Sequence, residues 1–319
     1  MATQALHVVL GAGPLGLATA RALCRRGHRV RIVSRSGATD MPLACEVARA
    51  DLNDASTVRE AAQGAAVVYQ CAQPPYHLWT TQFPALQAAI IQGVATTGAK
   101  LIVAENLYMY GAVQGPIHEG LPAQAHTRKG RVRARLAEQV AEAHQSGLLR
   151  TAAARGSNFF GPGVRHSTLG DGVFLPALQG EPAQAIGRLD VPHSYTYIED
   201  FGETMAILGE RDEALGRHWH VPTAPAMTQR ELIGMIYHEL GAEPQMRGMG
   251  RLMMMAGALF LRDARETLEM LYEFEQPFVV DSARFERTFQ VAPTPLDAAI
   301  RHTVAWYRAN QGASRVVAV

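Results

Sequence analysis

Three glycines near the start of the chain constrain its fold more than any other feature. Gly11, Gly13 and Gly16 follow the apolar run 7–10 and precede the amphipathic stretch 17–23, which gives a strand, a G-x-G-x-x-G turn and a helix in order. The first glycine of such a turn allows a tight bend, the second lets the backbone approach a pyrophosphate, and the third lets helix and strand pack closely. The helix N-terminus then offers free N–H groups to phosphate. The motif favours dinucleotide binding over a simple glycine turn. The residues predicted to make this contact are Gly11, Gly13, Pro14, Leu15 and Gly16.

The end of the second predicted strand indicates which dinucleotide is preferred. The β-branched run 29–33 ends in Ser34, Arg35 and Ser36. A site for NAD usually has an Asp or Glu about 20 residues beyond the first glycine, where it binds the ribose 2′-hydroxyl, but the first acidic residue here is Asp40. A guanidinium suits a 2′-phosphate through charge-assisted hydrogen bonds. We therefore expect these three residues to bind the cofactor and NADP(H) to be favoured over NAD(H), unless Arg35 stacks on the adenine or faces water.

Predicted strands and helices alternate through the first half of the chain. The expected strands are 7–10, 29–33, 46–50, 65–70, 100–104 and 149–154, and the helices between them include 56–63, 80–93 and 131–146. This alternation predicts a parallel sheet with right-handed crossovers. After residue 155 the pattern loosens, and further helices are expected over 199–208, 228–240, 263–272 and 296–310.

The expected architecture is α/β: a Rossmann-type doubly wound parallel sheet with a smaller, looser C-terminal substrate lobe. Residues 1–160 would form the dinucleotide-binding core, elements around 187–225 would return to it, and 161–319 would mainly form the substrate-binding lobe. Ligands in such sheets bind beyond the carboxyl ends of the strands. The polar residues that follow the strands are therefore expected around one cleft.

Composition argues against several kinds of partner. The formal net charge is +1 over 319 residues, so neither nucleic acid nor an anionic membrane is expected as a partner. The longest apolar run, 252–261, is too short to span a bilayer and is interpreted as a buried helix or a lid. Cys24, Cys45 and Cys71 are far apart in the sequence and lack metal-ligand spacing, which argues against a disulfide framework or a metal site and fits a cytoplasmic protein.

Five further segments carry a family resemblance. They are Asp51-Leu52, Cys71-Ala72-Gln73, the L-Y-M-Y-G of 107–111, the R-G-S-N-F-F-G-P-G of 155–163 and the Y-T-Y-I-E-D of 195–200. In this order, together with the glycine motif, they resemble the extended and atypical short-chain dehydrogenase/reductases, the NAD-dependent epimerase/dehydratase family. The resemblance covers about residues 5–310.

The resemblance implies further cofactor contacts and an assembly. Asp51 and Leu52 match the segment that contacts the adenine, and 71–73 match the segment beside the nicotinamide ribose. The cofactor contacts implied in this way are Asp51, Leu52, Cys71, Ala72, Gln73, Gly156 and Ser157. Members often dimerise through the helices after strands four and five, and 83–91 is apolar enough to take part, so a monomer or a homodimer is expected.

The chain departs from the family where the chemistry is done. The family uses a Tyr-x-x-x-Lys pair with a Ser or Thr, in which the Lys lowers the pKa of the phenol so that it can exchange a proton as hydride moves. Here no tyrosine lies between Tyr110 and Tyr195; Lys129 overlays the Tyr position, Arg133 the Lys position and Asn106 the Ser/Thr position. Guanidinium stays protonated, whereas a desolvated Lys can transfer a proton.

The candidate catalytic residues are therefore Asn106, Tyr110 and Lys129. Lys129 belongs to a run of five cations in 128–135, which either begins a solvated helix or clamps an anion. The candidate substrate-binding residues are Tyr76, Asn158, His193 and Tyr195. Each of these four could instead serve packing or hold a turn.

Two functions from different classes fit these residues. The first is an NAD(P)-dependent oxidoreductase or epimerase/dehydratase-like enzyme that transfers hydride to or from a small carbonyl, hydroxyl or sugar-type substrate without the usual Tyr-Lys pair. The alternative is a non-catalytic NADP(H)-binding sensor or binding protein of the same fold, which the missing pair motivates.

Overall fold

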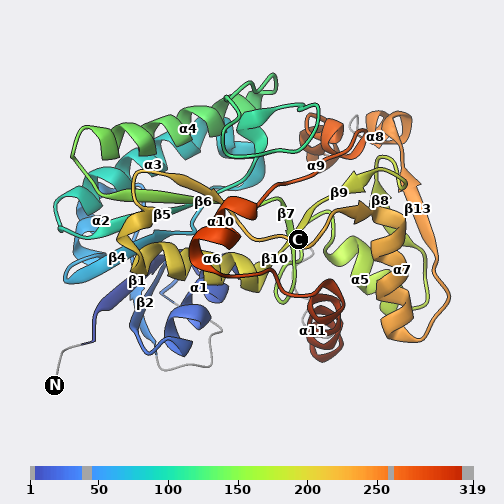
Figure 1. Cartoon of the computed structure of the whole chain (residues 1–319), viewed down its shortest axis with the longest axis horizontal. Coiled ribbons are helices and arrows are strands. Elements are labelled where there is room, and N and C mark those ends of the chain that lie inside the picture. The colour runs from blue at the N-terminus through green and yellow to red at the C-terminus, as the bar shows by residue number, and fades with distance from the viewer. Residues whose placement is uncertain (1–3, 38–44, 258–261, 311–319) are drawn as a thin grey trace.

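The computed structural model describes residues 4–37, 45–257 and 262–310. Seven parallel strands form its central sheet (Figure 1). In sheet order they are β11 (His218–His220), β6 (Thr151–Arg155), β5 (Lys100–Glu105), β4 (Ala65–Gln70), β1 (Leu6–Leu10), β2 (Arg29–Ser34) and β3 (Glu46–Arg49). From β1 the chain adds β2 and β3 on one side, and then β4, β5 and β6 on the other, so the strand order reverses between β1 and β4. Open α/β sheets bind ligands at such a switch point. The predicted Rossmann-type α/β fold is confirmed.

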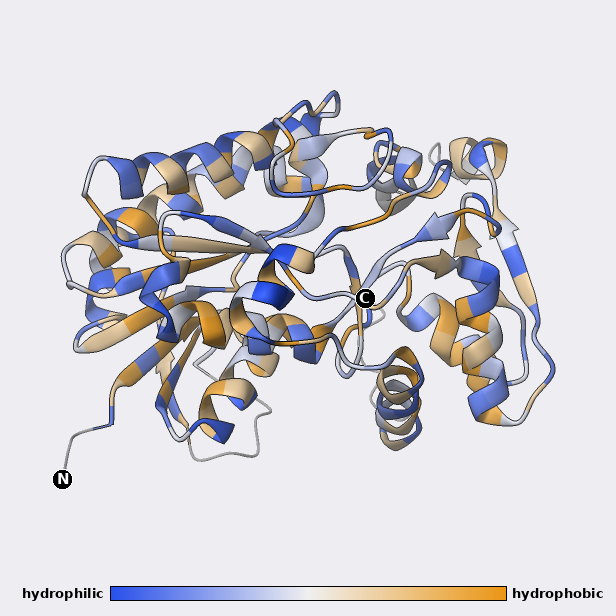
Figure 2. Ribbon diagram, viewed as in Figure 1, coloured by the Kyte–Doolittle hydropathy of each residue, from blue (hydrophilic) through white to orange (hydrophobic). Residues whose placement is uncertain are grey.

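Helices cover both faces of this sheet, because its strands are apolar on both sides. One face carries α2 (Ala55–Ala61), α3 (Trp79–Ala95) and α4 (Arg128–Gln145), and the other carries α1 (Pro14–Arg25) and α6 (Ile198–Glu210). Side chains alternate along each strand: Val8 packs in the core under α2–α4, whereas Val9 packs in the core under α1 and α6. Figure 2 shows the apolar character of the strands between these two layers.

The second half of the chain builds a lobe at one end of the sheet (Figure 1). One apolar core joins α5 (Asp171–Leu178), β8 (Ala183–Ile186), α7 (Gln229–Leu240), β13 (Met246–Met249) and α11 (Leu296–Ala309). Two short strand pairs connect the lobe to the sheet: β7 (Asn158–Phe160) with β10 (Tyr195–Tyr197), and β9 (Pro192–His193) with β12 (Met227–Thr228). The remaining helical elements are η1 (Tyr76–Leu78), η2 (Tyr108–Tyr110), η3 (Asp212–Ala214), α8 (Arg251–Gly257), α9 (Arg262–Leu268), η4 (Leu271–Phe274) and α10 (Ala283–Phe289).

The predicted helix 263–272 is interrupted in the structure. It divides into α9 and the short η4, so that residues 269 and 270 lie between two helical pieces. Glu266 of α9 contacts Lys129, and Glu273 of η4 contacts Asn158. The prediction of one continuous helix is therefore wrong, because contacts with another part of the chain override the local pattern.

Two apolar segments differ in their burial. In α8, Leu252 is 83% exposed and Met253 and Met255 are also exposed, so the described part of the run 252–261 is not a buried helix; residues 258–261 lie outside the described residues. Conversely, the apolar side chains of 83–91 pack into the chain's own core under α3. Ala85 in the same segment is exposed, and a dimer interface through this helix stays a prediction.

Two of the three cysteines meet in space although they are distant in sequence. The sulfur atoms of Cys24 and Cys45 lie 3.6 Å apart, and all three cysteines are free thiols. No helix in the described ranges is both long enough and apolar enough to cross a bilayer.

Candidate functional site

The glycine motif forms the turn between β1 and α1 at the carboxyl edge of the sheet. Gly11 has φ of 109°, and a Cβ there would lie 2.8 Å from the backbone nitrogen of Ala72, which follows β4. A Cβ on Gly16 would lie 1.9 Å from the carbonyl oxygen of Gly11. Glycine is thus required at both positions, one for the backbone conformation and both for close packing.

Gly13 differs from the other two glycines because the space beside it is open. A Cβ at Gly13 would meet no described atom within 4 Å, and the residue is exposed. Gly13 is also the N-cap of α1, without a side-chain cap, and Pro14 follows at the first helical position. An uncapped helix N-terminus beside open space suits a phosphate group. The residues present therefore fit a dinucleotide.

The residues after β2 and β3 lie beside this turn. Arg35 is exposed, and the hydroxyl groups of Ser34 and Ser36 are 3.3 Å apart. Asp51 is exposed and accepts hydrogen bonds from the backbone and side chain of Asn53, which lower the pKa of its carboxyl group; the positive charge of Arg35 lowers it further. Arg35 and Asp51 thus lie near each other at the same sheet edge.

Several predicted cofactor residues have buried side chains. Leu52 packs in the apolar core, and the hydroxyl of Ser157 donates to the carbonyl oxygen of Ser194 over 2.5 Å. Gly156 is buried, and a Cβ there would lie 2.5 Å from the ring of Phe201. The side chains of Leu52 and Ser157 are already occupied within the protein, so the predicted contacts of these two residues with a cofactor would come from their backbone.

The segment after β4 lies on the opposite side of the glycine turn. Burial raises the pKa of the Cys71 thiol to about 12, and its sulfur lies 3.7 Å from the hydroxyl oxygen of Thr19. This thiol is therefore neutral. Gln73 is exposed and Ala72 is half-buried against Gly11. Backbone contact, rather than thiol chemistry, is what the segment can offer a ligand.

Lys129 is buried in an ion-pair cluster between the two halves of the chain. It is 1% exposed, its ammonium donates to the carboxylate of Glu266, and Glu269 lies 3.4 Å away. The same ammonium sits 4.5 Å from the ring centre of Tyr76. The N–H donors of a Lys that is held by two carboxylates are engaged in hydrogen bonds. These contacts weigh against Lys129 as a proton-transfer residue.

Arg133 occupies the next turn of α4. Its guanidinium donates to the carbonyl oxygen of Ala104 over 3.3 Å and lies against the rings of Trp79 and Phe83. Burial lowers the pKa of Arg133 to about 10. Its Nε is buried with no partner among the described residues, so Arg133 retains a donor that can serve a ligand.

Tyr110 lies in a buried network and not at the open sheet edge. Its hydroxyl accepts from Arg155 over 2.7 Å, and Arg155 pairs with Glu105. His220 Nδ1 lies 3.0 Å from the carbonyl oxygen of Asp281 and must donate to it, so Nε2 accepts the Tyr110 proton over 3.0 Å. Burial raises the pKa of Tyr110. This phenol is held within the protein by its hydrogen bonds to Arg155 and His220, and its catalytic role stays a prediction.

Asn106 and Asn158 follow β5 and β6 at the sheet edge. The side-chain oxygen of Asn106 accepts from the backbone N–H of Tyr108 over 3.3 Å. The side-chain nitrogen of Asn158 lies 3.1 Å from Glu273 Oε2 and 3.2 Å from His193 Nε2. Asn158 therefore links the end of β6 to two residues of the second half of the chain.

His193 and Tyr195 are buried beside this link. His193 stacks between Phe274 and Phe278, with ring centres 4.7 and 5.0 Å away, and burial lowers its pKa to about 3. Tyr195 is 5% exposed. His193 is neutral and contacts Asn158, and Tyr195 packs against His193.

Sequence reasoning did not select Glu273, Tyr108 or Tyr272, which lie near the predicted substrate-binding residue Tyr76. Glu273 is 1% exposed, and its charge contributes to raising the pKa values of Tyr76, Tyr108 and Tyr272, so it lies near all three. The hydroxyls of Tyr76 and Tyr108 are 3.4 Å apart. No sequence signal marks Glu273, because its position depends on the break between α9 and η4.

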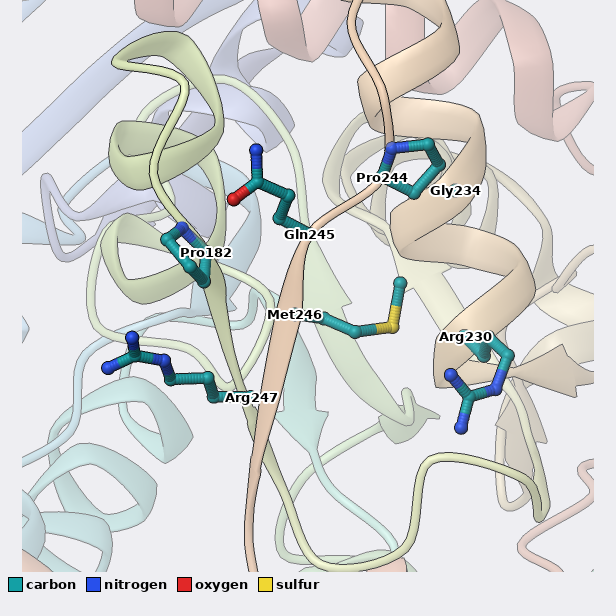
Figure 3. A pocket seen from close by; sticks show the side chains of 7 residues that line it. All are labelled: Pro182, Arg230, Gly234, Pro244, Gln245, Met246 and Arg247. Atoms are coloured by element: carbon teal, nitrogen blue, oxygen red, sulfur yellow. The ribbon is translucent and has the colours of Figure 1, made fainter.

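Two hollows lie away from the glycine turn. One, of about 740 Å³, lies beside α4 and reaches Tyr110 and Arg155. The other, of about 650 Å³, is on the second lobe (Figure 3), where Arg230, Met246 and Arg247 are among the lining residues. Neither is lined by residues of the glycine motif.

Comparison with known proteins agrees with this geometry. Residues 7–221 match the model of the NAD dependent epimerase/dehydratase family. The chain belongs to this family. The predicted family is thus confirmed, and with it the resemblance on which part of the site was based. No curated protein matches the chain significantly in sequence.

Solved structures of the same fold include several members of known activity. The chain is similar to the crystal structure of gox2253, with 20% identity, a TM-score of 0.80 and coverage of 96% of this chain and 98% of that one. It is similar to the dTDP-glucose 4,6-dehydratase DesIV of Streptomyces venezuelae with NAD bound, with 17% identity, a TM-score of 0.78 and coverage of 96% of this chain and 98% of that one. It is also similar to the UDP-glucose 4-epimerase of Thermus thermophilus in complex with NAD, with 18% identity, a TM-score of 0.75 and coverage of 95% of this chain and 99% of that one.

Proposed function

We propose that the protein is a nicotinamide-dinucleotide-dependent enzyme of the epimerase/dehydratase or reductase type that prefers NADP(H). The observation that carries the proposal is the uncapped N-terminus of α1 beside the open space at Gly13. Family membership and the NAD bound to DesIV and to the Thermus epimerase support a nicotinamide cofactor. The preference for the phosphorylated form rests on Arg35, exposed at the end of β2 with no acidic residue before it in the chain.

The residues that would hold the cofactor lie along one sheet edge. The backbone of 11–16 would bind the pyrophosphate, Ser34, Arg35 and Ser36 the adenosine end, and the backbone of 71–73 the nicotinamide end. When bound, the nicotinamide supplies or accepts a hydride. Arg133, on α4 at the position that the family's Lys would occupy, would use its Nε as a hydrogen-bond donor toward the ligand.

The substrate is proposed to be a small carbonyl, hydroxyl or sugar-type compound bound near Asn106, Tyr76 and Asn158. These residues follow β5, β4 and β6, so they surround the edge at which the nicotinamide would end. A cytoplasmic location and a monomer or homodimer are part of the same proposal. Lys129 remains a proposed contributor through its charge, which its carboxylate partners hold in place.

Transfer of label from NADPH tests this function. The protein would be incubated with NADPH carrying deuterium at nicotinamide C4 and a panel of aldehydes, ketones, UDP-glucose and dTDP-glucose. Deuterium in a product, or a product epimerised or dehydrated in the presence of NADP⁺, is expected. NADPH binding without label transfer or product would contradict the enzymatic proposal.

One observation favours a second function. The family's phenol position holds Lys129 in an ion pair, and the hydroxyl of Tyr110 is engaged by Arg155 and His220. A protein of this kind could bind NADP(H) as a sensor without turning it over. It would bind the dinucleotide selectively and give no labelled product with any compound of the panel.

A further inference from the structure

Glu273 is a buried carboxyl group whose two oxygens have different surroundings. It is 1% exposed, and its Oε2 accepts a hydrogen bond from the Asn158 side chain over 3.1 Å. Its Oε1 is buried and has no hydrogen-bond partner among the described residues. A buried polar atom without a partner is costly, so this oxygen requires an explanation.

The hydrogen bonds around Asn158 fix which oxygen can carry a proton. His193 Nδ1 lies 3.1 Å from the carbonyl oxygen of Glu273, which can only accept, so Nδ1 carries the hydrogen. His193 Nε2 then accepts from the Asn158 amide over 3.2 Å, and the second amide hydrogen goes to Glu273 Oε2. Oε2 is thereby committed as an acceptor. A proton on this carboxyl group belongs on Oε1.

Burial favours the protonated form of this group. It raises the pKa of Glu273 to about 8, against the opposing effect of the Asn158 hydrogen bond. The titratable groups that face it are Tyr76 and Tyr108 from the sheet edge, Tyr272 beside it in η4, and His193, which is neutral. The ammonium of Lys129 lies against the ring of Tyr76 and donates a hydrogen bond to Glu266.

Glu273 lies among residues that follow the carboxyl ends of the central strands. Its neighbours follow three adjacent strands: Tyr76 after β4, Tyr108 after β5 and Asn158 after β6. Ligands of such sheets lie beyond these strand ends. The hydroxyl of the neighbouring Tyr272 is also buried without a partner among the described residues. Two buried polar atoms of η4, this hydroxyl and Glu273 Oε1, therefore lack a hydrogen bond.

We propose that Glu273 is the acid–base residue of this enzyme and exchanges the proton of Oε1 with the substrate oxygen. The proposal rests on the proposed hydride-transfer function. As hydride adds to a carbonyl carbon, the π-electron pair of the C=O bond moves to oxygen, the Oε1–H bond of Glu273 breaks, and a new O–H bond forms on the substrate. The Glu273 carboxylate is then reprotonated from solvent, and oxidation of an alcohol runs the same steps in reverse.

Asn158 and His193 are positioning residues in this arrangement. They hold Oε2 and so aim Oε1, without contacting the proton that moves. Glu273 comes from the second lobe, whereas the family's phenol position lies on α4. The proposed acid–base group thus comes from a different element of the chain than the family's phenol.

Glu273→Gln tests the proposal, with Glu275→Gln as the matched control two residues along the chain. Glu275 is half-buried and pairs with Arg251 over 3.2 Å. Difference infrared spectra of wild type minus Glu273→Gln are expected to show the carbonyl stretch of a protonated carboxylic acid below the pKa of about 8, and its loss above that value. The control should leave the band unchanged. Absence of a Glu273-dependent band near neutral pH would overturn the proposal.

Turnover gives the second test, with NADPH and whichever compound of the panel is converted. Glu273→Gln is expected to lower kcat by about 10²–10⁴-fold, with little change in KM or in NADPH affinity. Equal kcat in Glu273→Gln and wild type would overturn the proposal. If NADPH binds and no compound is converted by wild type, the proposed function fails instead, and the infrared result alone decides the protonation of Glu273.

Asn158→Ala provides a test that does not depend on the folding of Glu273→Gln. Removing the hydrogen bond that lowers the pKa of Glu273 should move its infrared titration, and the matching limb of the pH–kcat profile, to higher pH. A purely structural role for Glu273 predicts a loss of stability with no movement of either titration, and that result would contradict the proposal.

Discussion

The two ends of the predicted active site are built in opposite ways. At the glycine turn, backbone closes tightly around Gly11 and Gly16 and leaves open space beside Gly13. Around Lys129, side chains from α4 and α9 fill the space with buried charges that pair with each other. The first region therefore leaves space for a ligand. In the second region the charges pair with one another, and Glu273 Oε1, the Tyr272 hydroxyl and Arg133 Nε are buried without a partner among the described residues. Substitutions in the first should change binding, and substitutions in the second should change stability and pH dependence.

A strong effect on stability is expected from Lys129→Ala. Removing a 1% exposed ammonium leaves the partly buried carboxylate of Glu266 without its cation and leaves Glu269 with the exposed Arg128 as partner. The free energy of unfolding should fall by about 3 kcal/mol, as measured by urea denaturation. Arg128→Ala is the control: its side chain is 62% exposed, pairs with the same Glu269, and should cost less than about 1 kcal/mol. Equal losses for the two variants would contradict the contrast.

Gly13→Asp should separate binding from stability most clearly at the glycine turn. A Cβ at this position meets no described atom within 4 Å, and the residue is the N-cap of α1, where Asp in place of Gly stabilises a helix by roughly a few tenths of a kcal/mol. The same carboxylate would repel a pyrophosphate and weaken NADPH binding by at least about 100-fold. Calorimetric titration and thermal unfolding measure the two effects.

Gly13→Ser is the matched control, because it caps the helix without adding charge. It should stabilise α1 similarly and weaken NADPH binding much less than Gly13→Asp. If Gly13→Asp bound NADPH as tightly as wild type, the phosphate would not lie at this helix N-terminus.

Arg35→Ala sharpens the comparison within the glycine end. Loss of a charge-assisted hydrogen bond of about 1.5–3 kcal/mol should weaken NADPH binding by about 10–100-fold and leave NADH binding unchanged. Arg59→Ala, at another exposed arginine on α2, should affect neither dinucleotide. Equal weakening of NADPH and NADH by Arg35→Ala would mean that Arg35 contacts a part common to both.

Glu273→Gln should change how the stability of the protein depends on pH. The folded-state pKa of Glu273 is raised to about 8 from an ordinary value of 4.5, so the native state holds a proton that the unfolded state releases. Wild type therefore loses stability as pH rises from about 4.5 to about 8. Glu273→Gln should lose less over this window, by about 1.4 kcal/mol for each pH unit between the two pKa values, in urea denaturation across pH. A steeper loss in the variant would contradict the raised pKa.

The fold could be predicted because its signals are local. The apolar strands 65–70 and 100–105 and the glycine turn each carry their pattern within a few residues. The parallel sheet and its switch point between β1 and β4 follow from that alternation. The positions of Gly11, Gly13 and Arg35 at one sheet edge were predictable for the same reason.

The chemistry at the other end could not be predicted in the same way. Tyr110 and Lys129 are the residue types that proton transfer needs, but their partners Arg155, His220 and Glu266 come from distant parts of the chain. Glu273 carries no local signal, because its burial depends on the break after α9 and on Asn158 from another lobe. Pairing between distant segments decides which of these groups is free to react.

The most direct measurement is calorimetric titration of the nucleotide-stripped protein with NADPH and with NADH. Micromolar binding of NADPH and much weaker binding of NADH is the expected result, since Gly13 leaves space for the pyrophosphate and Arg35 can meet the 2′-phosphate. Equal affinity for the two would contradict the role of Arg35. Binding of neither dinucleotide would contradict the assignment of the glycine turn as a cofactor site.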